Sequence, residues 1–571
     1  MLAWRRLGDH GELGLGMRRT CAFAIVTLSV AAVLVSAPQC WAALGATAGP
    51  GGATATTAYA PSPLGEPGIP GEAPVTSVSG ADEDWHNEDV TLAFSAQVPS
   101  GAVTAIQVRV DGGEVLESPG AACELVVAAP GDHTGDGLRL VEFRAVDGDG
   151  DVEEWQSVTV KIDTRRPSAD LLHAVGAMRT GTARIDFRVD DESPGAGAAD
   201  VTIVLSTRSG HTVKTLRLKG QSAGADLAVR FRCDLPCGYY RIDMRARDLA
   251  GNPATPVVHT RLQVVRWMKL GSFGAAAISV GQRVDTKGSP VSRVDNLPHD
   301  KYGVRMYLTG GRLWNYPGGQ ARYGLQNLNT YRLTGDEFYF RRAAAQAQRL
   351  IDTHISVNGA WFYPLRFLRY RHSPVKNDEP MRPPWFGGMA QGGALSLMVR
   401  MYEITGEAKY RIAAKATLSS FLHVGPSNAP WVVNLDGMKR LWIQEWPRLP
   451  LDYTYNGHMI ALFGLHDYYS LTKDTLALVL FRAAASAALD YAPKFRRPGG
   501  ISRYCLLHGT PNEKYHGVHI TCLRHLANYT GEDAFRRWAD VYLEDYSSSS
   551  GLQARQGEVD LLDLLSDQQS P

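Results

Sequence analysis

The chain lacks an excess of charge of either sign. Its 571 residues include 59 Lys and Arg and 58 Asp and Glu, which gives a formal net charge of +1. Proteins that bind nucleic acid usually present a strongly basic surface, so this balance gives no reason to expect a nucleic-acid partner. The chain is too long for one hydrophobic core, and we expect three or four structural units.

Cysteine is also scarce, with seven residues in the whole chain. Cys123, Cys505 and Cys522 do not have the spacing of a metal site, and we predict no metal centre. Cys233 and Cys237 flank a turn-like Asp-Leu-Pro sequence. An oxidising compartment could close this spacing into a disulfide, and two free thiols in a hairpin are the alternative.

Residues 1–43 have the order of an export signal. The apolar run "TCAFAIVTLSVAAVLVSA" follows a basic stretch that contains Arg5, Arg6, Arg18 and Arg19. Cys40 and Ala42 are small residues in a cleavage-like arrangement. We therefore predict a secreted or cell-surface protein. The apolar run is also close to the length of a bilayer span, so a membrane anchor through residues 20–42 is the alternative.

Residues 44–74 lack any apolar period and are dense in Gly, Pro, Ala and Thr. Such a segment cannot bury enough surface to offset the entropy lost on ordering, and we predict a flexible linker. At the other end of the chain we predict a disordered tail over residues 549–571.

From Val75 to Val265 the sequence consists of short alternating runs, such as "VTLAFSAQV" and "RLVEFRAV", separated by Gly, Asp and Pro. This alternation predicts two β-sandwiches, at residues 75–165 and 166–266. "FRAVDGDGDVE" and "MRARDLAGNPA" look like one corner repeated after about 100 residues, the length of an immunoglobulin-like domain. Both modules resemble the Ig-like modules common in exported bacterial proteins.

Three acidic residues in the first of these corners, Asp147, Asp149 and Asp151, could hold calcium through carboxylate oxygens. No distant bidentate glutamate completes such a site in the sequence pattern. We therefore favour a solvated turn.

Helical patterns replace the strand patterns beyond Val265. Four segments share the plan of an amphipathic run, a tight turn and a second run, and their turns contain Thr334, Thr405, Thr472 and Thr530. In three turns a glycine follows, which suits the left-handed residue that ends a helix, and the next Asp or Glu suits the start of another helix. Lys473 takes the glycine position in the third turn.

Repeated helical pairs joined by long loops either stack as a solenoid or close into an (α/α) toroid. The loops here, such as "WVVNLDGMKRLWIQEWPRLPLDYTYNG", are aromatic and rich in Gly and Pro, which suits loops that converge at one mouth. We predict two all-β Ig-like sandwiches followed by an all-α (α/α) toroid over residues 280–548. Aromatic rings at such a mouth fit sugar faces, although the same rings would serve a plain core.

The helical part contains, in order, "WFGGMAQGGALSLMVRMYEITGEAKY", "WIQEWPRLPLDYTYNGHMIALFGLHDYY", "GGISRYCLLH" and "KYHGVHITCLRHL". This series, from about Asp295 to Tyr546, resembles the C-terminal catalytic domain of D-glucuronyl C5-epimerase. The resemblance implies an isomerase without a cofactor that converts glucuronate to iduronate within heparosan-type chains. It also implies a uronate-containing polysaccharide as partner, and a homodimer as in related epimerases. The N-terminal half does not resemble the β-domains of the animal enzymes.

Epimerisation at C5 needs one group to remove the proton beside the carboxylate and another to return a proton from the opposite face. The resemblance assigns this work to Tyr504 in "SRYCLL", Tyr515 in "KYHGVHI" and Glu445 in "QEWP". A tyrosine hydroxyl both donates and accepts, but its pKa of about 10 must be lowered before it acts as a base. From the residues alone, the two tyrosines would be core residues and Glu445 a loop carboxylate.

Two positions depart from the family pattern. Trp446 follows Glu445 where the family has a tyrosine, and an indole donates a hydrogen bond but cannot take up a proton. Leu507 stands where an arginine is expected three residues after Tyr504, and Arg503 or His508 are the residues that could compensate. The acid/base work therefore falls to Glu445 together with Tyr504 or Tyr515.

We expect further contacts to substrate, each with a structural alternative, from Gln391, Trp446, Asn456, Arg503, His516 and His519. For Gln391 the alternative is a tight helix contact, and for Asn456 it is turn chemistry. His516 and His519 are three residues apart on a predicted helix, but no third ligand lies at metal spacing. We expect these two histidines to orient Tyr515 or to touch the uronate carboxylate.

Three functions fit these observations. The first is an exported enzyme that epimerises a uronate polymer at C5. The second is a polyuronate lyase, which shares the removal of the C5 proton. The third is a surface glycan-binding protein without turnover, which Trp446 and Leu507 favour.

Overall fold

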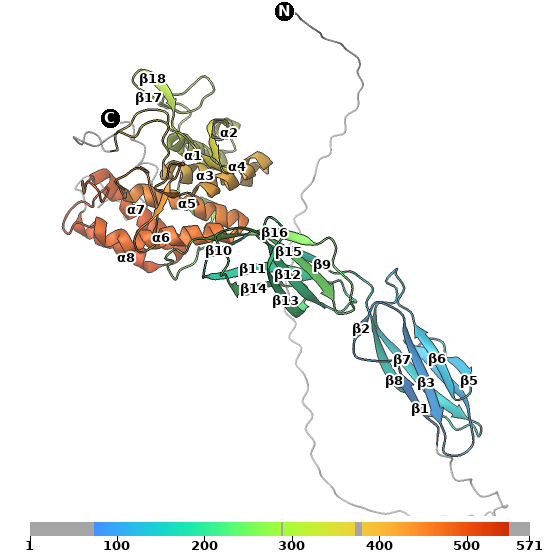
Figure 1. The fold of residues 1–571 in the computed structure, drawn as a ribbon. Helices are drawn as coiled ribbons and strands as arrows, with labels where there is room; N and C mark the ends of the chain where they lie inside the picture. The colour runs from blue at the N-terminus through green and yellow to red at the C-terminus, as the bar shows by residue number, and fades with distance from the viewer. Residues whose placement is uncertain (1–72, 287–288, 372–379, 547–571) are drawn as a thin grey trace, which may run out of the picture. The chain divides into compact units, whose positions relative to one another are not determined.

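The computed structural model describes residues 73–286, 289–371 and 380–546 (Figure 1). Within these residues the N-terminal part is built from strands and the C-terminal part mainly from helices, in the order that the sequence predicts. The predicted signal at residues 1–43 and the predicted tail at 549–571 lie outside the described residues, as does nearly all of the linker predicted at 44–74.

The first β module has two sheets around one core, with strand orders β1-β3-β6 and β2-β8-β7-β4-β5. Every second residue of β3 is buried, as expected of a strand with one face on a core. Phe94 of β3 and Phe143 of β7 meet between the sheets with ring centroids 5.0 Å apart. The strands are β1 (Val75–Ser79), β2 (Trp85–His86), β3 (Val90–Gln97), β4 (Val103–Val110), β5 (Leu116–Pro119), β6 (Ala122–Val127), β7 (Gly137–Asp147) and β8 (Gln156–Ile162).

The second β module repeats this plan, with sheets β14-β11-β9 and β10-β16-β15-β12-β13 around a separate core. The two-sheet architecture is therefore present twice, whereas the Ig-like assignment stays a prediction. The strands are β9 (Ser168–Leu171), β10 (Val175–Met178), β11 (Thr182–Asp190), β12 (Ala198–Ser206), β13 (Thr212–Ser222), β14 (Asp226–Arg232), β15 (Gly238–Asp248) and β16 (Val258–Val265).

The corner repeated in the sequence is also repeated in the structure. The Asp147 N–H donates to the Asp151 carbonyl at 3.1 Å, and the Asp151 N–H donates back to Asp147 Oδ1 at 2.9 Å. In the second module Asp248 and Asn252 make the same pair of bonds, at 3.1 and 2.7 Å. Because the Asp147 carboxylate accepts backbone N–H groups, the first corner has the geometry of an aspartate-closed turn.

Cys233 and Cys237 are free thiols in this structure. Cys233 is buried in the core of the second module and Cys237 is exposed. The alternative of two free thiols therefore holds in this structure, but the predicted hairpin is wrong, because the segment connects β14 and β15 of two different sheets.

The helical part also contains short elements, which lie before α1 and in the connections between the helical pairs. These are the 3-10 helix η1 (Val280–Gln282) and the strands β17 (Met306–Thr309), β18 (Arg312–Asn315), β19 (Ile355–Val357), β20 (Ala360–Phe362), β21 (Val424–Gly425), β22 (Val433–Leu435) and β23 (Leu441–Ile443). β23 pairs antiparallel with β22 and leads directly into "QEWP".

The part of the chain that the structure describes contains eight α-helices, arranged as four successive pairs. They are α1 (Pro317–Thr334), α2 (Glu337–Thr353), α3 (Gly388–Thr405), α4 (Ala408–Ser420), α5 (Tyr455–Thr472), α6 (Thr475–Phe495), α7 (Glu513–Thr530) and α8 (Asp533–Asp545). The first helix of each pair contacts the first helix of the next, α1 with α3, α3 with α5 and α5 with α7. Closure of this series into an (α/α) toroid stays a prediction.

The four threonine turns are built alike. In each pair the threonine is the last residue of the first helix, and its hydroxyl donates to the carbonyl four residues earlier. The same hydroxyl accepts the N–H two residues later. The next residue is left-handed, with φ of 67° to 69° at the three glycines and 53° at Lys473. The predicted helix ends are confirmed, and Lys473 adopts the glycine conformation.

Helix α6 is the one described helix long and apolar enough to cross a membrane. In this structure 67% of its apolar window is buried against other parts of the protein. Its alanine-rich face packs in the helical core, where Phe481, Ala484 and Phe495 are inaccessible to solvent. The packing is that of a core helix. The apolar run at residues 20–42 lies outside the described residues.

Candidate active site

The three predicted catalytic side chains come together in the helical part. Glu445 follows β23, Tyr504 lies in the segment between α6 and α7, and Tyr515 is in the first turn of α7. The Tyr504 hydroxyl points at Glu445 Oε2, with the two oxygens 3.5 Å apart. The rings of Tyr504 and Tyr515 are in contact, with centroids 4.5 Å apart. Tyr504 and Tyr515 are 59 and 70 residues after Glu445 in the sequence, and they form one group with it in the structure.

Backbone contacts hold these groups in place. The Tyr504 N–H donates to the Thr510 carbonyl at 2.8 Å, and the Tyr504 carbonyl accepts from the Tyr455 N–H at 3.1 Å, which ties the tyrosine to the start of α5. Gly457, in the first turn of α5, faces the Glu445 side chain, and a β-carbon at this position would collide with Oε2. The carboxyl group therefore requires glycine at residue 457.

The residue Glu445 is only 6% exposed. Burial, reinforced by the neighbouring charge of Asp452, raises the pKa of Glu445 from 4.5 to about 8, although Arg369, Tyr504 and Asn456 act in the opposite direction. Burial and the Glu445 charge also raise the pKa of Tyr504 well above its usual value. At neutral pH both groups are protonated, and a small rise in pH ionises the carboxyl first.

Arg369 is a functional candidate that the sequence reasoning missed. Its guanidinium lies 5.9 Å from the ring centroid of Trp446, and Nη1 donates to the Tyr307 hydroxyl at 3.1 Å. Its charge lowers the pKa of Glu445, which places it electrostatically beside the catalytic candidates. Leu507, where the family pattern has an arginine, is 38% exposed at the surface. The only sequence signal for Arg369 was the arginine-rich run "RFLRYRH".

Trp446 stacks on Trp385, with ring centroids 5.4 Å apart, in an apolar cluster that also includes Leu365, Phe367 and Met381. The Trp446 side chain lies close enough to Tyr504, and the Asn456 side chain close enough to Glu445, to lower the pKa of each of these groups by hydrogen bonding. Trp446 and Asn456 therefore belong to the immediate surroundings of Glu445 and Tyr504.

A cavity of about 690 Å³ borders the tryptophan stack. Trp385 and Pro447 form part of its wall, together with Trp431 and the cations Arg382 and Arg448. Aromatic faces and cations are the surfaces that suit acidic sugars. Glu445, Tyr504 and Tyr515 do not line this cavity, so it adjoins the catalytic candidates through Trp446 and does not contain them.

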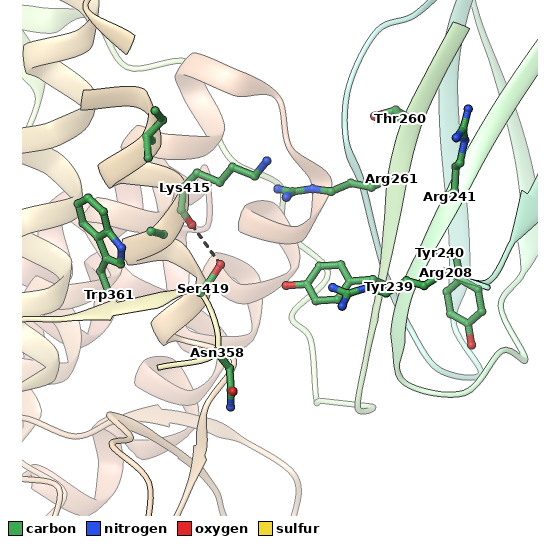
Figure 2. A pocket seen from close by; sticks show the side chains of 13 residues that line it. Arg208, Tyr239, Tyr240, Arg241, Thr260, Arg261, Asn358, Trp361, Lys415 and Ser419 are labelled. Atoms are coloured by element: carbon green, nitrogen blue, oxygen red, sulfur yellow. Dashed lines mark hydrogen bonds between the residues drawn. The ribbon is translucent and has the colours of Figure 1, made fainter. Parts of the chain in front are cut away.

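A second cavity, of about 680 Å³, lies between the second β module and the helical part (Figure 2). Its wall carries four cations, Arg208, Arg241, Arg261 and Lys415, together with aromatic side chains, and no acidic residue. Burial and the neighbouring arginines, Arg261 first, lower the pKa of Lys415, which reflects the crowding of positive charge. This cavity is separate from the catalytic candidates.

Two predicted substrate contacts are occupied by the protein itself. The Gln391 amide accepts from the Tyr363 N–H at 2.9 Å and donates at 2.8 Å to both the Trp361 carbonyl and the Ser420 hydroxyl. Gln391 thus has a structural role, which was the alternative to a contact with substrate. Arg503 Nη1 donates to the carbonyls of Lys494 and Arg496 at the end of α6. None of these bonds involves Glu445.

The two histidines of α7 also bond inside the fold. His516 Nδ1 accepts from the Ser502 N–H at 3.1 Å, and its Nε2 lies 3.0 Å from the Tyr542 carbonyl. His519 Nδ1 lies 2.9 Å from the Ser502 hydroxyl, and burial lowers its pKa well below the usual value. Both rings therefore contact Ser502, and the expected contacts to Tyr515 or a uronate carboxylate have no support in these bonds.

Glu445→Gln should change how stability depends on pH. A carboxyl whose pKa rises from 4.5 to about 8 on folding favours the folded state at acidic pH. That contribution is lost as pH rises towards 8, at a cost on the order of 4 kcal/mol. Glutamine cannot ionise, so the variant should lose less stability than the wild type between pH 5 and pH 8, as measured by thermal unfolding at both values. The exposed Glu544→Gln is the matched control. Equal pH dependence in all three proteins would contradict the assigned pKa.

Comparison with known proteins adds to this geometry. Residues 356–544 match the family described as D-glucuronyl C5-epimerase C-terminus. D-glucuronyl C5-epimerase of Caenorhabditis elegans is 24% identical over 203 residues, which is 32% of this chain and 32% of the relative. An uncharacterized protein of Methanocaldococcus jannaschii is 23% identical over 161 residues, 28% of this chain and 52% of the relative. The chain thus spans about a third and about half of the lengths of these two relatives.

Solved structures resemble the chain only distantly. A family 76 glycoside hydrolase from a bovine Bacteroides thetaiotaomicron strain is 12% identical and covers 67% of this chain and 89% of its own, with a TM-score of 0.25. Fibronectin(III)-like modules of Clostridium thermocellum CbhA are 14% identical and cover 33% of this chain and 94% of their own, with a TM-score of 0.21.

Proposed function

We propose, from the match of residues 356–544 to the family described as D-glucuronyl C5-epimerase C-terminus, that this protein is a polysaccharide epimerase that inverts uronate residues at C5. The observation that carries the proposal is the contact of the buried carboxyl of Glu445 with Tyr504, which in turn packs on Tyr515. These are the three residues that the family motifs select.

The reaction breaks the C5–H bond and makes a new one on the opposite face. A base takes the proton, and the electron pair moves into the substrate carboxylate, which becomes an enediolate with a second negative charge. An acid on the other face then gives a proton to C5, and the carboxylate is restored. No oxidant or cofactor is needed for this balance, because one proton leaves and one returns.

The geometry suggests a division of these roles. The Tyr504 hydroxyl donates to Oε2 and so stabilises the ionised form of Glu445, which then takes the C5 proton and becomes neutral. Glu445 and Tyr504 touch each other, so they act from one face of the sugar. Tyr515, which is half-buried and lies beyond the Tyr504 ring, is the candidate for the other face. Arg369 pairs with the substrate carboxylate, and the Trp446 N–H and the Asn456 amide, which border Tyr504 and Glu445, bond its hydroxyls.

The central test is incorporation of deuterium. Wild-type protein incubated with glucuronate polymers in deuterated water should place deuterium at C5 and form iduronate, as followed by NMR. Glu445→Gln should lower the exchange rate by at least about 100-fold, because amides do not take up protons, and Tyr504→Phe and Tyr515→Phe by about 10- to 100-fold. Tyr370→Phe, at an exposed tyrosine, is the matched control. Failure of the wild type to exchange at C5 with every polymer offered would refute the proposal.

The exchange rate should rise with pH. The pKa of Glu445 is raised to about 8, mainly by burial, so its basic form is the minor species at pH 7 and the major species above pH 8. The value of kcat/KM should therefore increase as pH passes from 6 to 8 and level off above it. A rate that is flat or falling over this range would show that ionised Glu445 is not the base.

Arg369→Gln should weaken recognition of the substrate carboxylate. Loss of one partner of a buried charge pair typically costs about 2–5 kcal/mol, so kcat/KM on the acidic polymer should fall by about 30-fold or more. Tyr307→Phe removes the hydrogen bond from Arg369 but keeps the cation, and it should change kcat/KM by less than about threefold. Binding of the carboxyl-reduced polymer should be equal in wild type and Arg369→Gln. A fall of equal size on the reduced polymer would assign Arg369 a structural role.

Trp446 favours one competing function, a glycan-binding protein without turnover. Binding of uronate oligosaccharides without any exchange at C5 would establish it. Polyuronate lyase activity, which shares the first step, would instead give an unsaturated product that absorbs ultraviolet light. The cationic cavity in Figure 2 supports an acidic polymer as the ligand in all three cases.

The proposal also covers where the protein is located and what it binds. The N-terminal residues 1–43 support export, with the product either secreted or held at the cell surface through residues 20–42. The partner is then an extracellular uronate-containing polysaccharide, and a homodimer is the assembly that the family resemblance suggests.

A further inference from the structure

Three metal-ligand side chains meet beside the candidate active site. Asp452, Cys505 and His508 each offer one donor atom, and these atoms lie within 4.8 Å of one another. Asp452 and Cys505 are inaccessible to solvent, and the His508 side chain is 17% exposed. Cys505 and His508 have the spacing C-x-x-H within one loop, whereas Asp452 comes from the segment before α5. The sequence spacing alone therefore gives only two ligands.

The distances among these atoms fit one small cation. His508 Nδ1 lies 3.4 Å from Cys505 Sγ and 3.6 Å from Asp452 Oδ1. Tetrahedral zinc with bonds of about 2.0–2.3 Å to N, O and S separates its ligand atoms by about 3.3–3.6 Å. The two distances therefore match two edges of such a tetrahedron, and a mixed N, O and S ligand set is one that zinc accepts.

The arrangement does not fit a cysteine nucleophile. In a Cys-His-Asp relay the imidazole uses one nitrogen for the thiol and the other for the carboxylate. Here both partners face the same nitrogen, Nδ1 of His508. Three donors that face one point are the arrangement of a cation site.

We propose that Asp452, Cys505 and His508 bind one zinc ion, with a water molecule or a further ligand in the fourth position. The ion joins two segments that the backbone already brings together, because the Asp452 carbonyl accepts the N–H groups of Leu506 and Leu507 at 3.2 and 3.3 Å. Tyr504 precedes the first zinc ligand of its loop. The ion therefore fixes the segment that carries Tyr504 to the segment before α5.

The test uses the full chain without a histidine tag, stripped with a chelator and titrated with Co²⁺ and then Zn²⁺. Cobalt in a tetrahedral site with a thiolate gives a thiolate-to-cobalt charge-transfer band and intense visible bands. We expect these bands to saturate at one equivalent and to disappear when one equivalent of Zn²⁺ is added. This readout needs no substrate, so it is independent of whether the chain epimerises uronates.

Two variants identify the ligands. Cys505→Ser should abolish the charge-transfer band, and His508→Ala, at a partly exposed side chain, should weaken cobalt binding at least about tenfold and leave the fold intact by circular dichroism. Cys237→Ser, an exposed thiol in the second β module, is the matched control and should retain the full spectrum. The proposal is overturned if the wild type shows no charge-transfer band, or if the band survives in both Cys505→Ser and His508→Ala.

Discussion

The burial of one carboxyl group, that of Glu445, is the constraint on which the rest of this site depends. An ionised carboxylate is costly to remove from water, so the group is held as a neutral acid at neutral pH and bonded by Tyr504. Its position requires the absence of a side chain at Gly457 and the close approach of the segment before α7 to the start of α5. The site is thus built from loops, and the helices that these loops connect set their relative positions.

The frame is made of local elements repeated four times. Each turn uses one threonine hydroxyl twice, as a donor to the end of one helix and as an acceptor for the start of the next. The helices meet at very short range where glycines allow it, as where Gly392 and Gly464 let the backbones of α3 and α5 touch. The turns within each helical pair are short, whereas the connections between pairs are long and carry most of the candidate functional residues. This is the usual division between scaffold and site.

The features that the sequence predicted well depend only on residues that are close together in the chain. The left-handed residue after Thr405 follows from a Thr-Gly-acid turn within a few residues, and the alternation of β3 follows from its own pattern. Glu445, Tyr504 and Tyr515 were found because ordered motifs mark them, although no local pattern says that they meet. Arg369 and Asp452 were missed because their role depends only on distant neighbours. For His516 and His519, helical spacing predicted a common face but not that Ser502 would occupy it.

Tryptophan at position 446 limits which groups beside Glu445 can carry a proton in the proposed reaction. A tyrosine there would offer a second proton carrier beside Glu445, whereas the indole offers a donor alone. Glu445 and Tyr504 are in contact and so approach a sugar from one side. The proposed inversion at C5 needs protons on both sides, so it requires a sugar between the Glu445–Tyr504 pair and a group such as Tyr515, whose ring rests against Tyr504 in this structure. Substrate must then separate rings that touch in the free protein. A site that cannot open in this way would remove and return the C5 proton from one face only, exchanging hydrogen without changing the sugar.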